Sequence, residues 1–160
     1  MPGGYCGKTK DYKGNDNFIT LKEDWDAIKE YIPKSKVIWE AFYCEGSSGD
    51  YLRELGFNVI HKDIDFFENN LGECVISNPA FSIKKKVIER LIELNKPFIL
   101  ILPSECLFYK YMRPLKDDLQ IIIPKKRMNF IEQDKGLKKF NFDCMYFCWK
   151  MNLKSDLIML

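Results

Sequence analysis

The clearest chemical content of this sequence lies in four residues that follow an apolar run, Asn78-Pro79-Ala80-Phe81. Asn78 offers a side-chain carbonyl acceptor, and Pro79 has no N–H while its own carbonyl stays available. Two neighbouring acceptors suit an amine that donates two hydrogens, such as the N6 amine of adenine, and they make that amine a better nucleophile. The Phe81 ring could then stack on a base turned out of its helix. Taken alone, the stretch is better explained as a strand that ends in an Asn-Pro turn.

Carboxylates follow two other apolar stretches. Glu40 ends an otherwise apolar run, where a carboxylate needs a partner that the ammonium group of a ligand would supply. Asp63 and Asp65 come after residues 57–62, where one acid could hold ribose hydroxyls and the other an exocyclic amine. Phe66 could lie against the purine face. The alternative interpretation is a pair of solvated loop acids.

Residues 44–49, with the sequence CEGSSG, have the spacing of a glycine-rich nucleotide loop in which cysteine replaces the first glycine. Gly46 would allow positive φ and a close approach of the backbone to a ligand. As a nucleotide signature alone the motif is weak, and a tight strand–helix turn explains it equally well. His61, the only histidine, is interpreted as a packed or edge residue rather than a base. With no CxxC pair, no metal site is predicted.

The hydrophobic pattern predicts the elements that must position these loops. Strands are expected over residues 36–43, 57–67, 73–78 and 96–105. Helices are expected over residues 21–32, 47–57, 82–95 and 106–115. Residues 119–131 and 142–151 are expected to pair antiparallel. This order predicts an α/β fold, with an open, mostly parallel sheet, helices on both faces and a C-terminal antiparallel hairpin. Ligands of such sheets bind beyond the C-terminal ends of the strands, which brings the three loops into one crevice.

The composition fits one globular domain, because 160 residues of which 46% are hydrophobic can bury a core. Residues 1–17 are predicted to form a flexible basic arm, and residues 18–160 a single catalytic domain. A net charge of +2 argues neither for nor against nucleic acid. The start of the chain is not typical of a signal peptide, and the longest apolar run, Phe98 to Leu102, is too short to span a membrane. We therefore expect an intracellular protein, cytoplasmic, nuclear or virion-associated, with reduced cysteines and no membrane partner.

Three motifs taken in order resemble those of the class I S-adenosylmethionine-dependent adenine-N6 methyltransferases, especially the small phage and giant-virus members. They are WEAFYCEGSSG (residues 39–49), HKDIDFF (61–67) and SNPAFS (77–82). The resemblance extends over residues 17–149. It implies a Rossmann-like methyltransferase fold, S-adenosylmethionine as the cofactor, and methylation of the N6 amine of adenine in nucleic acid.

The resemblance also implies roles for individual residues. The residues that it assigns to the cofactor are Thr20, Glu40, Phe42, Gly46, Asp63, Asp65 and Phe66. Glu40 and Gly46 would line the methionine part, and Thr20 would touch its carboxylate. Asp63 would bind the ribose and Asp65 the adenine amine of the cofactor. The residues that would hold the target adenine are Asn78, Pro79 and Phe81.

The sequence departs from the family pattern at three positions, where Ala41, Cys44 and Ala80 replace a proline, a glycine and a proline. If the family glycine has positive φ, the Cβ of Cys44 is strained. Ala80 keeps the Pro79 carbonyl and removes only rigidity. These departures leave open a second hypothesis, a catalytically silent fold-mate that binds nucleic acid or a partner subunit.

Basic residues cluster at Lys84-Lys85-Lys86 and Lys125-Lys126-Arg127, and also at Lys138-Lys139 and at Lys8, Lys10 and Lys13. The first cluster begins a predicted helix, where the helix dipole disfavours cations, so phosphate contacts explain it better than a solvated face does. The sequence does not separate DNA from RNA, or either from a protein glutamine amide, which is also a planar NH₂ donor. A partner subunit could supply target recognition. A dinucleotide-dependent oxidoreductase is disfavoured, because nothing in that class explains residues 78–81.

Overall fold

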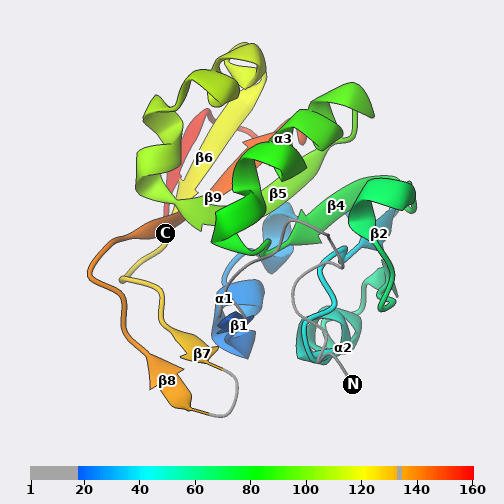
Figure 1. The fold of residues 1–160 in the computed structure, drawn as a ribbon, viewed down its shortest axis with the longest axis vertical. Helices are drawn as coiled ribbons and strands as arrows, with labels where there is room; N and C mark the ends of the chain where they lie inside the picture. The colour runs from blue at the N-terminus through cyan, green and yellow to red at the C-terminus, as the bar shows by residue number, and fades with distance from the viewer. Residues whose placement is uncertain (1–17, 133–134) are drawn as a thin grey trace.

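The computed structural model describes residues 18–132 and 135–160, and this part of the chain forms two sheets (Figure 1). The main sheet has seven strands in the order β10-β6-β9-β5-β4-β2-β3. Only β9 runs antiparallel to its neighbours within this sheet. The predicted α/β class with a mostly parallel sheet is therefore confirmed, and so is the antiparallel pairing of β6 with β9. Residues 1–17, predicted to be a flexible basic arm, lie outside the described residues.

The strands of the main sheet are short at both edges and longer in the middle. They are β2 (Val37–Trp39), β3 (Asn58–Ile60), β4 (Cys74–Ser77), β5 (Phe98–Pro103), β6 (Leu119–Ile123), β9 (Cys144–Trp149) and β10 (Leu157–Met159). The α-helices are α1 (Lys22–Asp26), α2 (Ser47–Glu54) and α3 (Lys84–Glu93). Short 3₁₀ turns are η1 (Lys29–Tyr31), η2 (Phe66–Glu68), η3 (Phe81–Ile83), η4 (Ser104–Phe108) and η5 (Lys110–Leu115).

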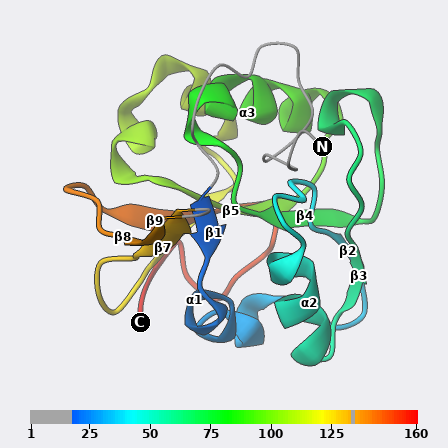
Figure 2. The same ribbon diagram turned by 60° about the horizontal axis from the view of Figure 1, so that its bottom comes forward.

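Helices cover both faces of the sheet, with α3 on one side and α1 and α2 on the other (Figure 2). The six-residue strand β5 shows how the sequence produces these layers, because successive side chains of a strand point to opposite faces. Phe98, Leu100 and Leu102 pack in the core that contains the buried face of α3. Ile99 and Ile101 pack in the core beneath α1 and α2. A strand that is buried on both faces has a continuous apolar sequence, and β5 has one over Phe98 to Leu102.

The direction of strand addition reverses between β2 and β4. After β2 the chain adds β3 on one side and then returns to place β4 on the other, so β4 and β3 flank β2. The loops that leave β2 and β4 therefore diverge at the carboxyl edge of the sheet. In open α/β sheets this reversal point is where ligands bind.

A second sheet of three strands, in the order β1-β7-β8, was not predicted. Its strands are β1 (Phe18–Thr20), β7 (Phe130–Glu132) and β8 (Gly136–Lys138). The single strand expected over residues 119–131 was wrong, because the chain leaves the main sheet after Ile123 and re-enters a strand at Phe130. Pro124 follows β6 directly and has no N–H to continue the ladder. The predicted hairpin is thus interrupted by an excursion that forms most of the second sheet.

Other expectations also need correction. The helix expected over residues 106–115 is instead the pair η4 and η5, separated by Tyr109, whose φ of −75° and ψ of 141° are extended. Pro114 lies within η5 and cannot donate to an α-helical hydrogen bond. The edge strand β10, which pairs parallel with β6, was missed. Strands β2 and β3 are also shorter than expected, so Glu40 and Asp63 lie in loops beyond them.

Candidate functional site

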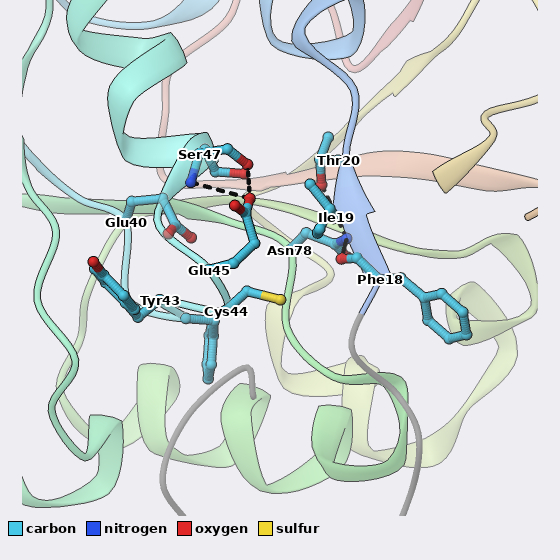
Figure 3. Close-up of a pocket in the computed structure, with 11 residues that line it drawn as sticks. Phe18, Ile19, Thr20, Glu40, Tyr43, Cys44, Glu45, Ser47 and Asn78 are labelled. Atoms are coloured by element: carbon cyan, nitrogen blue, oxygen red, sulfur yellow. Dashed lines mark hydrogen bonds between the residues drawn. The ribbon is translucent and has the colours of Figure 1, made fainter. Parts of the chain in front are cut away.

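A hollow of about 240 Å³, open solvent included, lies at the reversal point between β2 and β4 (Figure 3). Four segments line it: β1, the loop from β2 to α2, the first turn of α2, and the residue that follows β4. The lining residues are Phe18, Ile19, Thr20, Glu40, Phe42, Tyr43, Cys44, Glu45, Ser47, Ser48 and Asn78. The structure thus brings together two of the three predicted loops, and it adds a wall from the second sheet.

Asn78 is 7% exposed and is held by β1. Its Nδ2 donates to Thr20 Oγ1 at 3.0 Å and lies 3.5 Å from the main-chain oxygen of Phe18. Its Oδ1 is buried and has no hydrogen-bond partner within residues 18–132 and 135–160. An unsatisfied buried acceptor is costly, and such atoms are few in folded proteins. The amide is thus fixed by its nitrogen, and its oxygen is left to accept from a ligand.

Glu40 is 1% exposed and has two partners on the protein. Ser77 Oγ, at the end of β4, donates to Glu40 Oε1. His61 Nδ1 lies 2.6 Å from Glu40 Oε2 and 3.0 Å from the main-chain oxygen of Glu40. The Nδ1–H donates to the main-chain oxygen, whereas Oε2 makes a close ion-pair contact with the ring and has no hydrogen-bond partner within the described residues. The sequence predicted that a ligand would supply the partner of the Glu40 carboxylate. In the structure the partners are Ser77 and His61 of the protein itself.

His61 fits between the loop and α2 because Gly49 has no side chain. A Cβ placed on Gly49 would lie 2.2 Å from His61 Cδ2. The other side of the imidazole stacks on Tyr43, with ring centroids 4.7 Å apart. Burial lowers the pKa of His61, but the hydrogen bond and charge of Glu40 outweigh burial and hold that pKa above its ordinary value. The prediction that His61 is a packed residue is confirmed, because the side chain is buried. Its contact with the carboxylate of Glu40 was not predicted.

A second carboxylate, that of Glu45, lies over the start of α2. Its Oε1 accepts from the main-chain nitrogen of Ser47 at 3.2 Å and from the Ser47 hydroxyl. Gly46, which precedes α2, has φ of 98°, so the positive φ expected there is confirmed. Two carboxylates and one unpaired carbonyl oxygen therefore line the same hollow. This arrangement favours a ligand that carries positive charge.

Cys44 has φ of 52°, which lies in the left-handed region where a residue with a Cβ is strained. This is the strain expected if cysteine replaces a glycine of positive φ. Its side chain lines the hollow, and Figure 3 shows its sulfur directed toward the side of the pocket where Asn78 lies. The space inside the hollow that a water-sized sphere can enter is only about 10 Å³, far below the roughly 300–1,000 Å³ typical of small-molecule pockets. The hollow must therefore widen to admit a ligand of cofactor size.

The strain at Cys44 predicts the effect of a substitution. Cys44→Gly should raise the free energy of unfolding by up to about 1 kcal/mol, because a left-handed residue with a Cβ costs about 1–2 kcal/mol and glycine returns part of this as unfolded-state entropy. Cys44→Ala keeps the Cβ and should bring no such gain. Urea denaturation of the two variants and the wild type measures both effects. An equal gain for alanine would place the strain in the sulfur contact rather than in the backbone.

The third predicted loop, residues 63–67, does not line the hollow. Asp65 Oδ1 accepts from the main-chain nitrogen of Phe67 at 2.8 Å and so caps η2. Phe66 is fully buried, with its ring centroid 5.0 Å from that of Phe42. The expectation that Phe66 lies against a purine is corrected, since its ring is part of the core and has no open face. Asp63 is half-buried in this loop, and its ribose contact stays a prediction.

The loop after β4 has a backbone at Ala80 that is compatible with proline. Ala80 has φ of −56° and ψ of 128°, values that a proline could also adopt, so losing the second proline leaves the backbone course unchanged. Phe81 is half-buried in an aromatic cluster with Phe130 and Phe142, each 6.2 Å away between ring centroids. This cluster joins the loop to the second sheet. Stacking of Phe81 on a base stays a prediction.

Lys84 has partners within the protein. Its Nζ donates to the main-chain oxygen of Phe81 at 3.0 Å and lies 5.7 Å from the centroid of the Tyr109 ring. This lysine therefore ties the start of α3 to the loop after β4, which explains a cation in the first helical turn without a phosphate. Lys85 and Lys86 are exposed, and Lys85 Nζ lies 3.8 Å from Glu89.

The second basic cluster is partly neutralised. Arg127 Nε and Nη2 donate to the two oxygens of Asp143, both at 2.9 Å. Lys126 Nζ lies 3.7 Å from Glu23 of α1, on the face of the sheet opposite α3 (Figure 2). Lys125 is exposed. The structure therefore does not gather the two basic clusters on one face beside the hollow.

The cysteines within the described ranges are unpaired, and all except Cys44 are buried. Burial raises the pKa of Cys74 to about 11 and that of Cys148 to about 12, so these thiols stay protonated. No group of three or more His, Cys, Asp or Glu side chains in residues 18–132 and 135–160 could hold a metal ion. In the same residues, no helix is long and apolar enough to cross a membrane.

Comparisons with protein-family models, with curated proteins and with solved structures found no match. The fold and the hollow together define an α/β protein with a polar, carboxylate-lined pocket at the reversal point of its sheet.

Proposed function

We propose that this chain is an S-adenosylmethionine-dependent methyltransferase with a Rossmann-like methyltransferase fold, which methylates the N6 amine of adenine in nucleic acid. The observation that carries this proposal is the state of Asn78. Its Nδ2 is bound by β1, and its Oδ1 is buried without a partner in the described part of the chain. A fixed, unsatisfied acceptor is what an incoming NH₂ donor needs.

The position of Asn78 supports the same reaction. The residue follows β4 at the reversal point of the sheet, and Glu40 follows the adjacent strand β2. When bound, S-adenosylmethionine supplies an electrophilic methyl group and carries positive charge on its sulfur and amine. Glu40 and Glu45 fit such a cation by charge. Asn78 Oδ1 and the Pro79 carbonyl would then orient the target amine and stabilise the positive charge that grows on it.

Nucleic acid is proposed as the substrate because adenine provides the planar amine and a π-face. The half-buried Phe81 beside Asn78 could receive that face once the base leaves its stack. The exposed lysines of the first turn of α3, Lys85 and Lys86, lie close along the chain to this loop. We propose them, with Lys125, as contacts to phosphate. A partner subunit would supply any extended target recognition.

Calorimetry with S-adenosylmethionine and with S-adenosylhomocysteine, its demethylated product, tests the cofactor. We expect binding of both, and no binding up to millimolar concentration would contradict the proposal. Transfer of a tritiated methyl group to separate pools of DNA, RNA and protein then identifies the substrate. Labelling of protein alone would redirect the proposal to a glutamine amide.

One observation favours a second candidate, a catalytically silent protein of the same fold that binds nucleic acid or a partner subunit. Cys44 lines a hollow whose volume lies below the usual range of ligand pockets. In the silent protein this side chain would occupy the cofactor position permanently. Cys44→Gly distinguishes the two candidates, because cofactor binding that appears only in this variant would support the silent fold-mate.

A further inference from the structure

The buried carboxylate of Glu40 contacts the protein at both of its oxygens, by a hydrogen bond at Oε1 and by an ion-pair contact at Oε2. Ser77 Oγ donates to Oε1, and His61 Nδ1 lies 2.6 Å from Oε2. The side chains of His61 and Glu40 are only 2% and 1% exposed. The imidazole cannot turn away easily, because Tyr43 stacks on it and α2 approaches it at Gly49. The orientation of Glu40 in the hollow therefore depends on His61.

The two nitrogens of His61 have different surroundings. Nδ1 faces Glu40, whereas Nε2 is buried and has no hydrogen-bond partner within residues 18–132 and 135–160. A proton on Nδ1 is donated to the main-chain oxygen of Glu40 in both charge states of the ring and keeps the ring beside the carboxylate. A proton on Nε2 adds the positive charge but leaves a buried donor unsatisfied, which is unfavourable. The proton on Nε2 is thus the one that the ring can lose while Glu40 stays held.

We propose that His61 is a positioning residue for Glu40, and that loss of its Nε2 proton opens this carboxylate to the ammonium group of the cofactor. The inference rests on the proposed function, because it assigns that ammonium group to Glu40. With His61 protonated, Glu40 already has its compensating charge. With His61 neutral, Glu40 keeps its geometry and offers an uncompensated negative charge. Binding of one ammonium then releases one proton to the solvent.

The other groups around His61 do not replace it in this role. Tyr43 stacks on the ring from the loop after β2. Arg53 of α2 lowers the pKa of His61 by its positive charge, and its guanidinium is paired with Asp50 at 3.1 Å and with the main-chain oxygen of Val59 at 3.2 Å. Glu40 is the group that raises the pKa of His61 above its ordinary value of about 6.5.

The proposal predicts a characteristic pH dependence for cofactor binding. Affinity should rise with pH by up to about tenfold per unit while His61 loses its proton, because one proton is released per ligand bound. At higher pH it should fall again as the ligand's own α-amino group loses its charge. The rise of affinity at low pH, the acid limb of the profile, reports the titration of His61. The fall at high pH, the alkaline limb, reports the titration of the ligand.

The test uses S-adenosylhomocysteine as the probe, with calorimetry from about pH 5.5 to 8.5 in buffers of different ionisation enthalpy, so that proton release is counted directly. His61→Asn is the informative variant, because the asparagine Nδ2 can replace Nδ1 as donor to Glu40 but does not titrate. It should bind without the acid limb and without releasing a proton. In His61→Gln the amide lies one bond further out, so we expect weaker binding at every pH.

A second readout does not require any ligand. His61 is the only histidine, so in protein without a histidine tag its imidazole NMR signal needs no assignment. We expect its pKa above about 6.5 in the wild type and a lower value in Glu40→Gln, which keeps the shape but removes the charge. Saturation with S-adenosylhomocysteine should also lower it.

The outcomes separate the inference from the function on which it rests. If the probe does not bind the wild type at any pH, the proposed function is overturned, and the inference with it. If the probe binds but His61→Asn retains the acid limb, only the inference is overturned. An unchanged pKa of His61 in Glu40→Gln also overturns the inference and leaves the proposed function standing.

Discussion

Replacement of Asn78 by alanine is expected to lower kcat for methyl transfer by at least about a hundredfold, while the affinity for S-adenosylhomocysteine stays nearly unchanged. The reason is the isolated position of Asn78 Oδ1, a buried acceptor without a partner in the described residues. Truncation removes the atom that would orient the amine and leaves the carboxylates of the hollow in place. Tritium transfer gives the rate, and calorimetry gives the affinity.

Thr20→Val is the matched control, because it removes only the hydroxyl that accepts from Asn78 Nδ2 at 3.0 Å. The main-chain oxygen of Phe18, 3.5 Å away, would then be the remaining acceptor for that nitrogen. We expect a smaller loss of kcat than for Asn78→Ala and little change in cofactor affinity. A loss of affinity instead would assign Thr20 to the cofactor carboxylate, as the family resemblance implies. Full activity of a folded Asn78→Ala protein would contradict the proposed site.

The layered sheet could be predicted from the sequence because its strands carry strong local patterns. Residues 98–102 are apolar throughout and are followed by Pro103, so the strand and its burial on both faces could be predicted together. Helix α3 shows apolar side chains at Val87, Ile88 and Leu91, which is the spacing of one helical face. Once alternation of strands and helices is recognised, the position of the crevice follows from topology.

The second sheet could not be predicted in the same way, because its three strands are only three residues each and come from distant parts of the chain. β1 pairs with β7 across more than a hundred residues, with Phe18 opposite Glu132. No local pattern specifies such a pairing. The consequence for the site is direct, because the support of Asn78 by Thr20 depends on this sheet.

The features of the site that depend on a single loop could be predicted from the sequence. The contacts between different loops could not. Glu40 and Asn78 stand at strand ends, which the sequence indicates. That His61 and Ser77 would hold Glu40 depends on the register of three adjacent strands, in which Trp39 lies opposite Ile60 on one side and Val75 on the other. Phe66 failed as a ligand contact for a related reason, since a phenylalanine in a loop sequence can equally be a core residue.

Gly49→Ala is expected to lower the free energy of unfolding by about 2 kcal/mol, although alanine favours a helix by up to about 1 kcal/mol over glycine. Gly49 lies inside α2, and an added Cβ would be 2.2 Å from His61 Cδ2 and 2.6 Å from His61 Cβ. The imidazole cannot move without leaving the stack on Tyr43 and the contact with Glu40. Urea denaturation measures the loss, and the NMR signal of His61 should report a lower pKa as the ring separates from the carboxylate.

A double-mutant cycle with His61→Ala isolates the cause of that loss. Removing the imidazole eliminates the two shortest contacts, those with Cδ2 and with Cγ at 2.3 Å, and leaves the contact with Cβ at 2.6 Å. In this background Gly49→Ala should cost at least about 1 kcal/mol less than in the wild type. Additive effects would contradict the account, because they would mean that the methyl group meets something other than the ring. A large coupling would show that one glycine in α2 sets the position of His61, and through it the position of Glu40.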